Sequence, residues 1–222
     1  MNFRLPVAKL LRLSLYKTVK FNFHYFGFRG LLRPVVLCGR NLYLRKLKGK
    51  VEVLSSCVGS VRLGFADVQV VDRRYNRSIW DNSGTVYFCG AAHVSAGAKI
   101  VNEGTIVFGN NIILNGDTTI VSKKGISFGD NCLISWGGLV MDTDFHPIYS
   151  RASGCRENND EQIVVGEKVW IGCKATLLKG ACLPNGTIVA ANAVVTKAFE
   201  EKCTLIGGVN RVIKHDVIWD YE

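Results

Sequence analysis

A six-residue repeat of aliphatic side chains constrains the fold of this chain more than any other feature. From residue 165 onward the repeat runs through Val165, Ile171, Leu177, Leu183, Val189 and Val195. A period of six matches neither an α-helix, whose period is 3.6, nor a single amphipathic strand, whose period is two. It matches short strands joined by tight bends, with one inward-facing side chain on each strand. The repeat therefore predicts a parallel β-solenoid, in which each coil contacts only its neighbours.

The same register appears upstream in three segments that begin twenty residues apart. Phe88, Phe108 and Phe128 each start such a segment, and the aliphatic residues that follow them are Val94, Ile100, Ile106, Leu114, Ile120, Ile126, Ile134 and Val140. Three hexads close one three-sided coil, and stacked coils pair their strands about 4.8 Å apart. We therefore expect an all-β solenoid over residues 51–206, preceded by a basic, partly helical segment (1–50) and followed by a tail (207–222).

The repeat lapses once, between residues 146 and 165. Adding eighteen to Phe128 gives position 146, where an aliphatic anchor is expected and His146 stands instead. Residues 147–162 are polar and charged, which predicts a loop excursion out of the coil. Loops that leave a stiff scaffold commonly carry function, so His146 is the leading candidate for a functional residue. The remaining histidines are expected to be structural: His24, His93 and His215.

Several short motifs within the repeat resemble those of the hexapeptide-repeat acyltransferases. They are Ile134-Ser135-Trp136, Asp142-Thr143-Asp144-Phe145-His146, Val169-Trp170-Ile171-Gly172 and Val194-Val195-Thr196-Lys197. Roughly residues 50–215 look most like bacterial polysaccharide O-acetyltransferases of the maltose/galactoside acetyltransferase-like group. The resemblance implies a left-handed parallel β-helix, acetyl-CoA as acyl donor and a homotrimer with each donor groove between neighbouring prisms. It also implies direct attack of the acceptor oxygen on the acetyl carbonyl, without a covalent intermediate.

The chemistry of acyl transfer gives His146 a specific role. A base must take the proton of the attacking hydroxyl, and imidazole is suited to this because its free pKa lies near the working pH. If residues 142–146 are extended, Asp142, Asp144 and His146 point to one side. We expect Asp144 to orient the imidazole and Asp142 to bind acceptor hydroxyls, with turn chemistry as the alternative for both. The ring of Trp136 suits either stacking on a sugar or capping the coil edge.

The donor site follows from the resemblance alone. In the relatives, the coenzyme A groove is lined by the positions that match Cys173, Ala191, Thr196, Lys197 and Arg211, with Lys214 as a second basic contact. The relatives commonly carry a Gly-x-Pro turn after the last coil. This chain has Gly207-Gly208-Val209-Asn210 there, and the missing proline leaves the alignment of the two later cations open.

The charge of the chain is strongly asymmetric. Residues 1–50 contain twelve Lys and Arg and no Asp or Glu, whereas the rest contains sixteen basic and eighteen acidic residues. The aromatic residues Phe21, Phe23, Tyr25, Phe26 and Phe28 lie among these cations, between Lys20 and Arg29, which suits either an anionic membrane surface or packing on the chain's own fold. Twelve cations also permit nucleic-acid binding, but no recognition helix or stacking module accompanies them, so no nucleic-acid partner is expected.

The cysteine pattern and hydropathy exclude several classes of protein. The eight cysteines form no C-x-x-C pair and no histidine stands at zinc-finger spacing, so we predict no metal site and a reducing compartment. No cysteine has a nearby histidine in sequence, which leaves a cysteine nucleophile with little support. No apolar run approaches the roughly 20 residues of a membrane span, and residues 10–15 are interrupted by Arg12. A cytoplasmic protein, peripheral at the inner face of the membrane, is expected.

The leading functional prediction is an acetyl-CoA-dependent O-acetyltransferase. Its acceptor would be a saccharide or lipid-linked saccharide used for capsule, exopolysaccharide or lipopolysaccharide, bound between the 147–162 excursion and residues 73–84. N-acylation of an amino sugar is one alternative, because an amine acceptor also needs proton removal. A non-catalytic scaffold with a basic arm for lipid or nucleic acid is another. A zinc hydratase on the same fold is disfavoured, because His146 has no second histidine at a suitable interval in the repeat.

Overall fold

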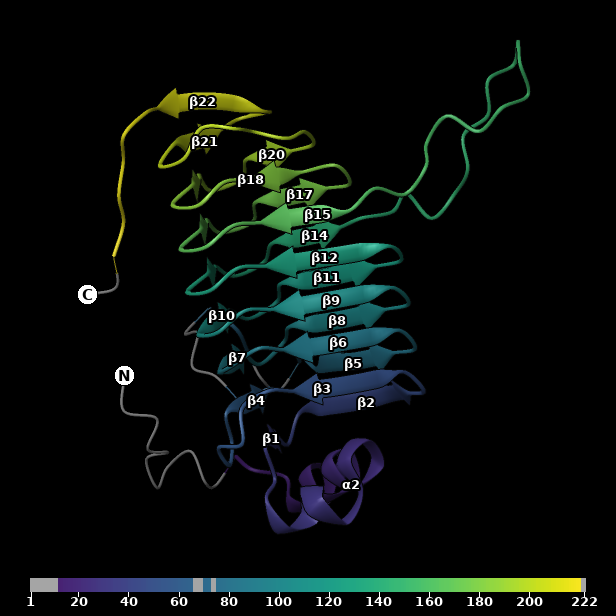
Figure 1. Ribbon diagram of the computed structural model, residues 1–222, viewed down its shortest axis with the longest axis vertical. Coiled ribbons are helices and arrows are strands. Elements are labelled where there is room, and N and C mark those ends of the chain that lie inside the picture. Colours follow the sequence, from purple (N-terminus) through teal and green to yellow (C-terminus); the bar gives the residue numbers. More distant parts are fainter. Residues whose placement is uncertain (1–11, 66–69, 73–74, 221–222) are drawn as a thin grey trace.

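The chain winds into a three-sided parallel β-helix in which each coil contributes strands to three sheets (Figure 1). The computed structural model describes residues 12–65, 70–72 and 75–220. Within these residues the strands of consecutive coils pair in parallel, and one antiparallel pair closes the C-terminal end. One α-helix, α2 (Leu15–Leu32), lies across the N-terminal end.

Each sheet is built from strands that recur once per coil. The first sheet contains β1 (Val36–Cys38), β4 (Val61–Leu63), β7 (Ala92–Val94), β10 (Ile112–Leu114), β13 (Leu133–Ile134), β16 (Trp170–Ile171), β19 (Ile188–Val189), β21 (Leu205–Gly207) and β22 (Arg211–Lys214). The second contains β2 (Leu42–Leu47), β5 (Ser78–Asn82), β8 (Lys99–Asn102), β11 (Thr119–Ser122), β14 (Leu139–Met141), β17 (Thr176–Leu178) and β20 (Val194–Val195). The third contains β3 (Lys50–Val53), β6 (Thr85–Phe88), β9 (Thr105–Phe108), β12 (Gly125–Phe128), β15 (Ile163–Val165) and β18 (Cys182–Leu183).

The anchors of the six-residue repeat form the core. Every anchor from Phe88 to Val195 is buried, with at most 3% of its surface exposed. The rings of Phe88 and Phe108 stack with centroids 5.1 Å apart, and those of Phe108 and Phe128 with centroids 5.6 Å apart. Stacked aromatic rings bury large apolar areas at low conformational cost. The predicted solenoid and its inward-facing positions are confirmed.

The excursion changes the register that the sequence predicted for His146. Ile126 pairs with Ile163 and Phe128 pairs with Val165, so the coil resumes only after the excursion. Ile163 is fully buried and occupies the anchor position, whereas His146 is exposed. His146 lies outside the coil, because the chain leaves at residue 142, before position 146 is reached, and Ile163 takes the anchor position that Ile106 and Ile126 hold in the preceding coils.

The first coil begins at Val36, within the basic segment that was expected to precede the solenoid. Its cations lie on outward-facing positions, as at Arg45 and Lys46, both of which pair with Asp81 of the next coil. These strands are not assigned to the solenoid by the sequence pattern, because outward positions of a β-helix accept any polar side chain and here they carry cations. At the other end, β22 lies within the predicted tail and pairs antiparallel with β21.

Helix α2 covers the open end of the first coil. Phe21 is fully buried and its ring lies 5.3 Å from that of Trp80. The Asn22 side chain donates to the carbonyl oxygen of Val36 at 2.6 Å and accepts from its N–H at 3.2 Å, which satisfies an edge strand that would otherwise be open. Gly27 has a φ of 60° and kinks the helix, a conformation that glycine adopts without steric cost.

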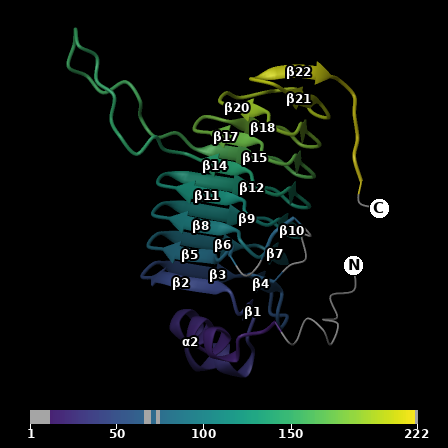
Figure 2. The same ribbon diagram turned by 180° about the vertical axis from the view of Figure 1, so that it is seen from behind.

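The C-terminal segment runs back along the outside of the solenoid (Figure 2). The ring of Trp219 lies 6.1 Å from that of Trp170, and its Nε1 donates to the carbonyl oxygen of Lys168 at 2.8 Å. No helix in the described part of the chain has the length and hydropathy needed to cross a bilayer.

Removing the ring of Phe108, the middle one of the three stacked phenylalanines, tests how much this stacking contributes to stability. We expect Phe108→Ala to lower the free energy of unfolding by about 3–5 kcal/mol, because the change removes buried area and leaves a cavity between two rings. Denaturant unfolding followed by far-UV circular dichroism measures the effect. The matched control is Phe28→Ala, at a position 78% exposed, which should change stability by about 0.5 kcal/mol or less. Equal losses for the two variants would contradict this account of the core.

Candidate functional site

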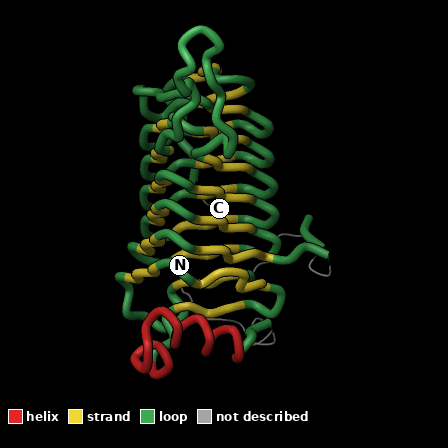
Figure 3. Tube along the Cα trace, turned by 90° about the vertical axis from the view of Figure 1, so that its right-hand side faces the viewer, coloured by secondary structure: helices red, strands yellow, loops and turns green. Residues whose placement is uncertain are grey.

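The excursion forms an arm that projects from the edge between the second and third sheets (Figures 1 and 3). The chain leaves after β14, at Asp142, and returns at β15. Tyr149 and Arg156 form an antiparallel bridge near the middle of the arm. The N–H of Ile148 donates to Oδ1 of Asn158 at 2.6 Å. Backbone and side-chain hydrogen bonds of its own therefore organise this loop.

Asp142 is buried beneath the arm and not available to a ligand. Its exposed fraction is 0%, and its two carboxylate oxygens accept four hydrogen bonds. The donors are Oγ of Ser122 at 2.8 Å and the backbone N–H groups of Lys123, Lys124 and Gly125 at 2.7, 3.0 and 2.7 Å. The structure contradicts the predicted acceptor-binding role of Asp142. The residue fixes the corner of the preceding coil, because a buried carboxylate must have its hydrogen bonds satisfied.

Asp144 contacts the base of the arm instead of the imidazole of His146. Its carboxylate accepts from Nζ of Lys179 at 2.6 Å and from Nδ2 of Asn158 at 2.8 Å. The hydrogen bond and charge of Lys179, together with Asn158, lower the pKa of Asp144 below its ordinary value. A lowered pKa means that this contact stabilises the folded arm at pH values above the ordinary pKa, and that the stabilisation is lost as the pH falls through the lowered value.

The local backbone explains why the predicted Asp144–His146 pair does not form. Phe145 has a φ of 61°, and the N–H of His146 donates to the carbonyl oxygen of Asp144 at 2.7 Å. Residues 144–146 therefore make a tight turn rather than an extended strand, so the two side chains do not share one side. The prediction of an extended 142–146 segment is wrong at this point.

His146 lies exposed at the root of the arm. Within the described residues its imidazole has no hydrogen-bond partner, and the residue is held through its backbone, because Nδ2 of Asn158 also donates to the His146 carbonyl oxygen at 2.8 Å. Asn158 is 8% exposed and thus clamps both Asp144 and His146. Sequence reasoning missed Asn158 and Lys179, since neither has a motif and their roles depend on the turn at Phe145.

Lysines from the coils on both sides of the arm lie near its root. Nζ of Lys123 lies 4.9 Å from the centre of the Phe145 ring, and Nζ of Lys124 donates to the carbonyl oxygen of Asp160 at 3.0 Å. Lys179 follows β17, two coils beyond Lys123 and Lys124, and Lys197 follows β20 at the equivalent corner of the next coil. Lys179 is paired with Asp144 at this edge, so Lys123 and Lys197 are cations with no carboxylate partner among the described residues.

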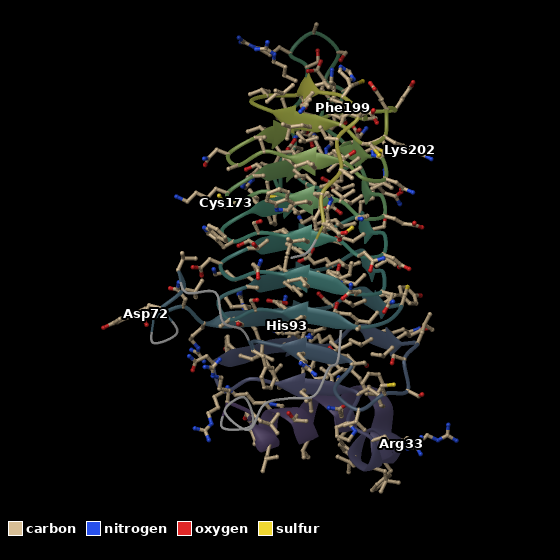
Figure 4. All side chains as sticks on the ribbon, turned by 90° about the vertical axis from the view of Figure 1, so that its left-hand side faces the viewer. Arg33, Asp72, His93, Cys173, Phe199 and Lys202 are labelled. Atoms are coloured by element: carbon tan, nitrogen blue, oxygen red, sulfur yellow. The ribbon has the colours of Figure 1, made fainter. Side chains whose placement is uncertain are left out.

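The predicted donor residues lie at two edges of the second sheet. Cys173 and Ala191 lie where the chain passes from the first sheet to the second, and the N–H of Asn192 donates to the carbonyl oxygen of Cys173 at 2.9 Å. Figure 4 shows Cys173 pointing outward at that edge. Thr196 and Lys197 follow β20 at the opposite edge, which also bears the arm.

The remaining predicted donor contacts come from the C-terminal strand. Arg211 and Lys214 are exposed on β22. Asn210, which precedes Arg211, accepts from the Thr196 N–H at 2.8 Å and donates to its Oγ1 at 2.7 Å. The structure thus places Thr196 beside the turn before Arg211, whereas Arg211 itself pairs with Gly207 at the end of β21 in the first sheet.

Trp136 does not lie beside His146. It occupies the corner between β13 and β14, so the width of the second sheet separates it from the root of the arm. Its side chain is 38% exposed, and the indole of Trp170 in the next coil donates to Oγ of Ser135 at 3.1 Å. The predicted stacking on an acceptor sugar remains a prediction for this edge, which Trp136 shares with Cys173.

The described residues contain no group of three or more His, Cys, Asp and Glu that could hold a metal ion. All eight cysteines are free. Burial raises the pKa of Cys38 to about 12 and that of Cys132 to about 11, so neither thiol is a nucleophile at neutral pH. The exposed imidazole of His146 is thus the group at the root of the arm best suited to take a proton from a ligand.

Comparison with known proteins agrees with this architecture. No protein-family model matches the chain. Over 49 residues it is 41% identical to the polysialic acid O-acetyltransferase of Neisseria meningitidis, a stretch covering 22% of this chain and 23% of that protein. Over 52 residues it is 36% identical to a putative lipopolysaccharide biosynthesis O-acetyl transferase of Escherichia coli, covering 23% and 26% respectively. The matched stretches therefore span about a quarter of the length of these curated relatives.

A solved structure extends the comparison to most of the chain. The crystal structure of the polySia-specific acetyltransferase NeuO is similar over 84% of this chain and 78% of that chain, with a TM-score of 0.55 and 22% identity. The predicted fold class, an all-β left-handed parallel β-helix, is confirmed. The resemblance to hexapeptide-repeat polysaccharide O-acetyltransferases is also confirmed at the level of sequence similarity.

The two aspartates of the motif should respond differently to the same substitution. We expect Asp142→Asn to lower the free energy of unfolding by about 1–3 kcal/mol, because an amide N–H₂ would face buried N–H donors. The matched variant Asp144→Asn weakens a contact that is partly exposed and should cost about 1 kcal/mol or less. Denaturant unfolding of both variants gives the comparison, and a larger loss for Asp144→Asn would refute the assignment of Asp142 as the buried anchor.

Proposed function

We propose that this chain transfers an acetyl group from acetyl-CoA to a hydroxyl of a saccharide, with His146 as the general base. The observation that carries the proposal is the exposed imidazole at the root of the arm, held through its backbone and left without a partner among the described residues. The sequence similarity to named saccharide O-acetyltransferases supports this choice of reaction.

The proposed reaction is a direct transfer. The acceptor oxygen attacks the acetyl carbonyl carbon while its proton passes to the imidazole of His146. The carbon–sulfur bond of the thioester then breaks, and the imidazolium returns the proton to the thiolate of coenzyme A. Imidazole suits both steps because its two protonation states are close in free energy near neutral pH. Asn158 and Lys179 act as positioning residues, since they hold the turn that carries His146.

The proposed donor groove uses the residues at both edges of the second sheet. Cys173 and Ala191 lie at one edge, whereas Thr196 and Lys197 lie with His146 at the other. A homotrimer would place the first edge of one prism against the second edge of the next and thereby assemble the two halves of the groove. Arg211 and Lys214 would meet phosphates of coenzyme A at its C-terminal end. Because the donor is made in the cytoplasm, we place the reaction there.

The proposed acceptor is an anionic saccharide. Lys123 and Lys124 lie beside the root of the arm and can contact a carboxylate or phosphate of a sugar chain, and the relative from Neisseria meningitidis is named for polysialic acid, an anionic polysaccharide. Transfer to the amine of an amino sugar would use the same base. A hydroxyl acceptor is preferred because both curated relatives are named O-acetyl transferases.

Replacing His146 tests the catalytic assignment. We expect His146→Ala to lower kcat by about 10²–10⁴-fold, because general-base catalysis contributes a factor of this size, while the fold stays intact since the side chain is exposed. Release of coenzyme A in the presence of polysialic acid, a neutral polysaccharide or an amino sugar provides the measurement. The matched control is His215→Ala, an exposed histidine paired with Glu201, which should keep full turnover. Unchanged turnover in His146→Ala would exclude His146 as the general base. Faster transfer to the amino sugar than to either polysaccharide would exclude a hydroxyl as the acceptor group.

Replacing Lys197 tests the donor groove. We expect Lys197→Ala to raise the KM for acetyl-CoA about tenfold, because a charged hydrogen bond to a phosphate or carbonyl is lost, and to leave the KM for the acceptor nearly unchanged. The control is Lys202→Ala, which removes an exposed lysine outside the proposed groove. If the two variants have the same KM for acetyl-CoA, Lys197 does not contact the donor.

A further inference from the structure

The outer face of the N-terminal cap exposes an apolar patch. We call it the cap patch and define it as the exposed apolar residues of α2: Leu15, Tyr16, Val19, Phe23, Phe28, Leu31 and Leu32. Their exposed fractions run from 39% to 85%, with the highest values at Leu32 and Phe28. A contiguous apolar surface of this kind marks an interaction site rather than ordinary protein surface.

The cap does not need these side chains to close the solenoid. The opposite face of α2 supplies the closing contacts, because Thr18, Phe21 and Asn22 are buried against the first coil. On the outer face, the rings of Phe23 and Phe28 lie edge to face with centroids 5.6 Å apart, across the kink at Gly27. This ring contact joins the exposed apolar residues before the kink to those after it.

A hollow of about 560 Å³ opens beside the patch, between the end of α2 and the first coil. Its apolar lining includes Phe26, Leu32 and Val53, and the side chains of Arg29 and Arg33 stand at its border. Both arginines are exposed. The hollow combines an apolar interior with two guanidinium groups, which matches an acyl chain below a phosphate headgroup.

The segment that carries the patch has charges of one sign, and the first carboxylate of the chain, Glu52, lies beyond it on the side of His24 and Tyr25. Residues 12–50 contain ten Lys and Arg and no Asp or Glu. Lys20, Arg29 and Arg33 are exposed on the same helix as the patch, and no carboxylate of this segment offsets them. Apolar side chains flanked by cations are the combination that binds the interface of an anionic bilayer, because burial and charge attraction add.

We propose that the cap patch docks on the surface of an anionic lipid bilayer. Phe28 and Leu32 enter the headgroup region, and Arg29 and Arg33 meet lipid phosphates. The solenoid then stands on its N-terminal end with its axis away from the lipid. Figure 4 shows Arg33 at this end and Lys202 at the opposite one. A second copy docked cap to cap would face these cations with its own, and the repulsion between like charges disfavours that contact.

This orientation sets the height of the candidate active site, a consequence that rests on the proposed function. Four steps of the second sheet separate β2 from β14, after which the arm leaves. With a strand spacing of about 4.8 Å and one helix diameter for the cap, His146 stands about 30 Å from the lipid headgroups. A bilayer-anchored acceptor must therefore present a hydroxyl far from its lipid, as a chain of several sugars does.

Binding to vesicles tests the proposal with the full chain. We expect the wild-type chain to bind vesicles of phosphatidylcholine mixed with phosphatidylglycerol at least tenfold more tightly than vesicles of phosphatidylcholine alone, and binding to weaken with salt. Phe28→Ser with Leu32→Ser should reduce binding at least tenfold. The matched control is Val209→Ser with Ile218→Ser, two positions 69% and 88% exposed near the other end, and it should bind as the wild type does.

Substituting the arginines provides a second, independent test. Arg29→Gln and Arg33→Gln should each lower binding to anionic vesicles about fivefold, whereas Lys202→Gln should leave it unchanged. Equal binding to both kinds of vesicle, or equal binding by the patch and control variants, would overturn the proposal. The proposal would also be overturned if the patch variants had a lower molar mass in solution than the wild type. A second copy of the chain would then cover the patch.

Acetyl transfer to a soluble acceptor separates this inference from the proposed function. The patch and arginine variants should keep wild-type turnover with soluble polysaccharide, which also shows that they are folded. If the wild-type chain acetylates no saccharide yet binds anionic vesicles through the cap patch, the proposed function fails and the docking surface stands.

Discussion

The parallel ladder between coils is the interaction on which the rest of the structure depends. Each strand pairs with the strand one coil below and one coil above. Equivalent positions in successive coils must therefore carry side chains that pack on one another for the stack to continue. Phe88, Phe108 and Phe128 keep one such place, and their rings stack with planes 13° and 3° apart. Val165 and Leu183 continue the column with smaller side chains. The coil shortens from twenty to eighteen residues at this change, and the arm leaves the solenoid between Phe128 and Val165.

A buried polar ladder at one corner fixes the root of the arm. Asn82, Asn102, Ser122 and Asp142 are spaced by twenty residues at the edge between the second and third sheets, and none has more than 1% of its surface exposed. Asn102 donates to Oδ1 of Asn82 at 2.8 Å, and Ser122 donates to Oδ2 of Asp142 at 2.8 Å. Asp142 is thus the last rung before the chain turns outward. Because its oxygens are all engaged, the exposed residues that follow start from a rigid point.

The sequence allowed the core to be predicted much better than the polar contacts. Anchors at six-residue spacing are visible because inward positions accept only apolar side chains, and His146 drew attention because the repeat stops there. The role of Asp142 could not be predicted, since it depends on a twenty-residue corner ladder in which asparagine, serine and aspartate are interchangeable. The positive φ of Phe145 gave no signal in the sequence, and it decides which way Asp144 and His146 point. The first coil was missed because its outward cations mask the inward Val36 and Val51.

The same stiffness that holds the root of the arm also links the two ends of the molecule. A β-helix has no hinge between its coils, because every coil is tied to the next through three ladders. The cap patch lies at one end of this rod and His146 lies near the other, so the distance between them is set by the number of coils alone. An enzyme that acts on a chain growing from a surface needs such a fixed height, since the height selects which sugar of the chain reaches the base. Under the proposed function and docking surface, the number of coils between cap and arm would set which sugar of a surface-anchored chain reaches His146.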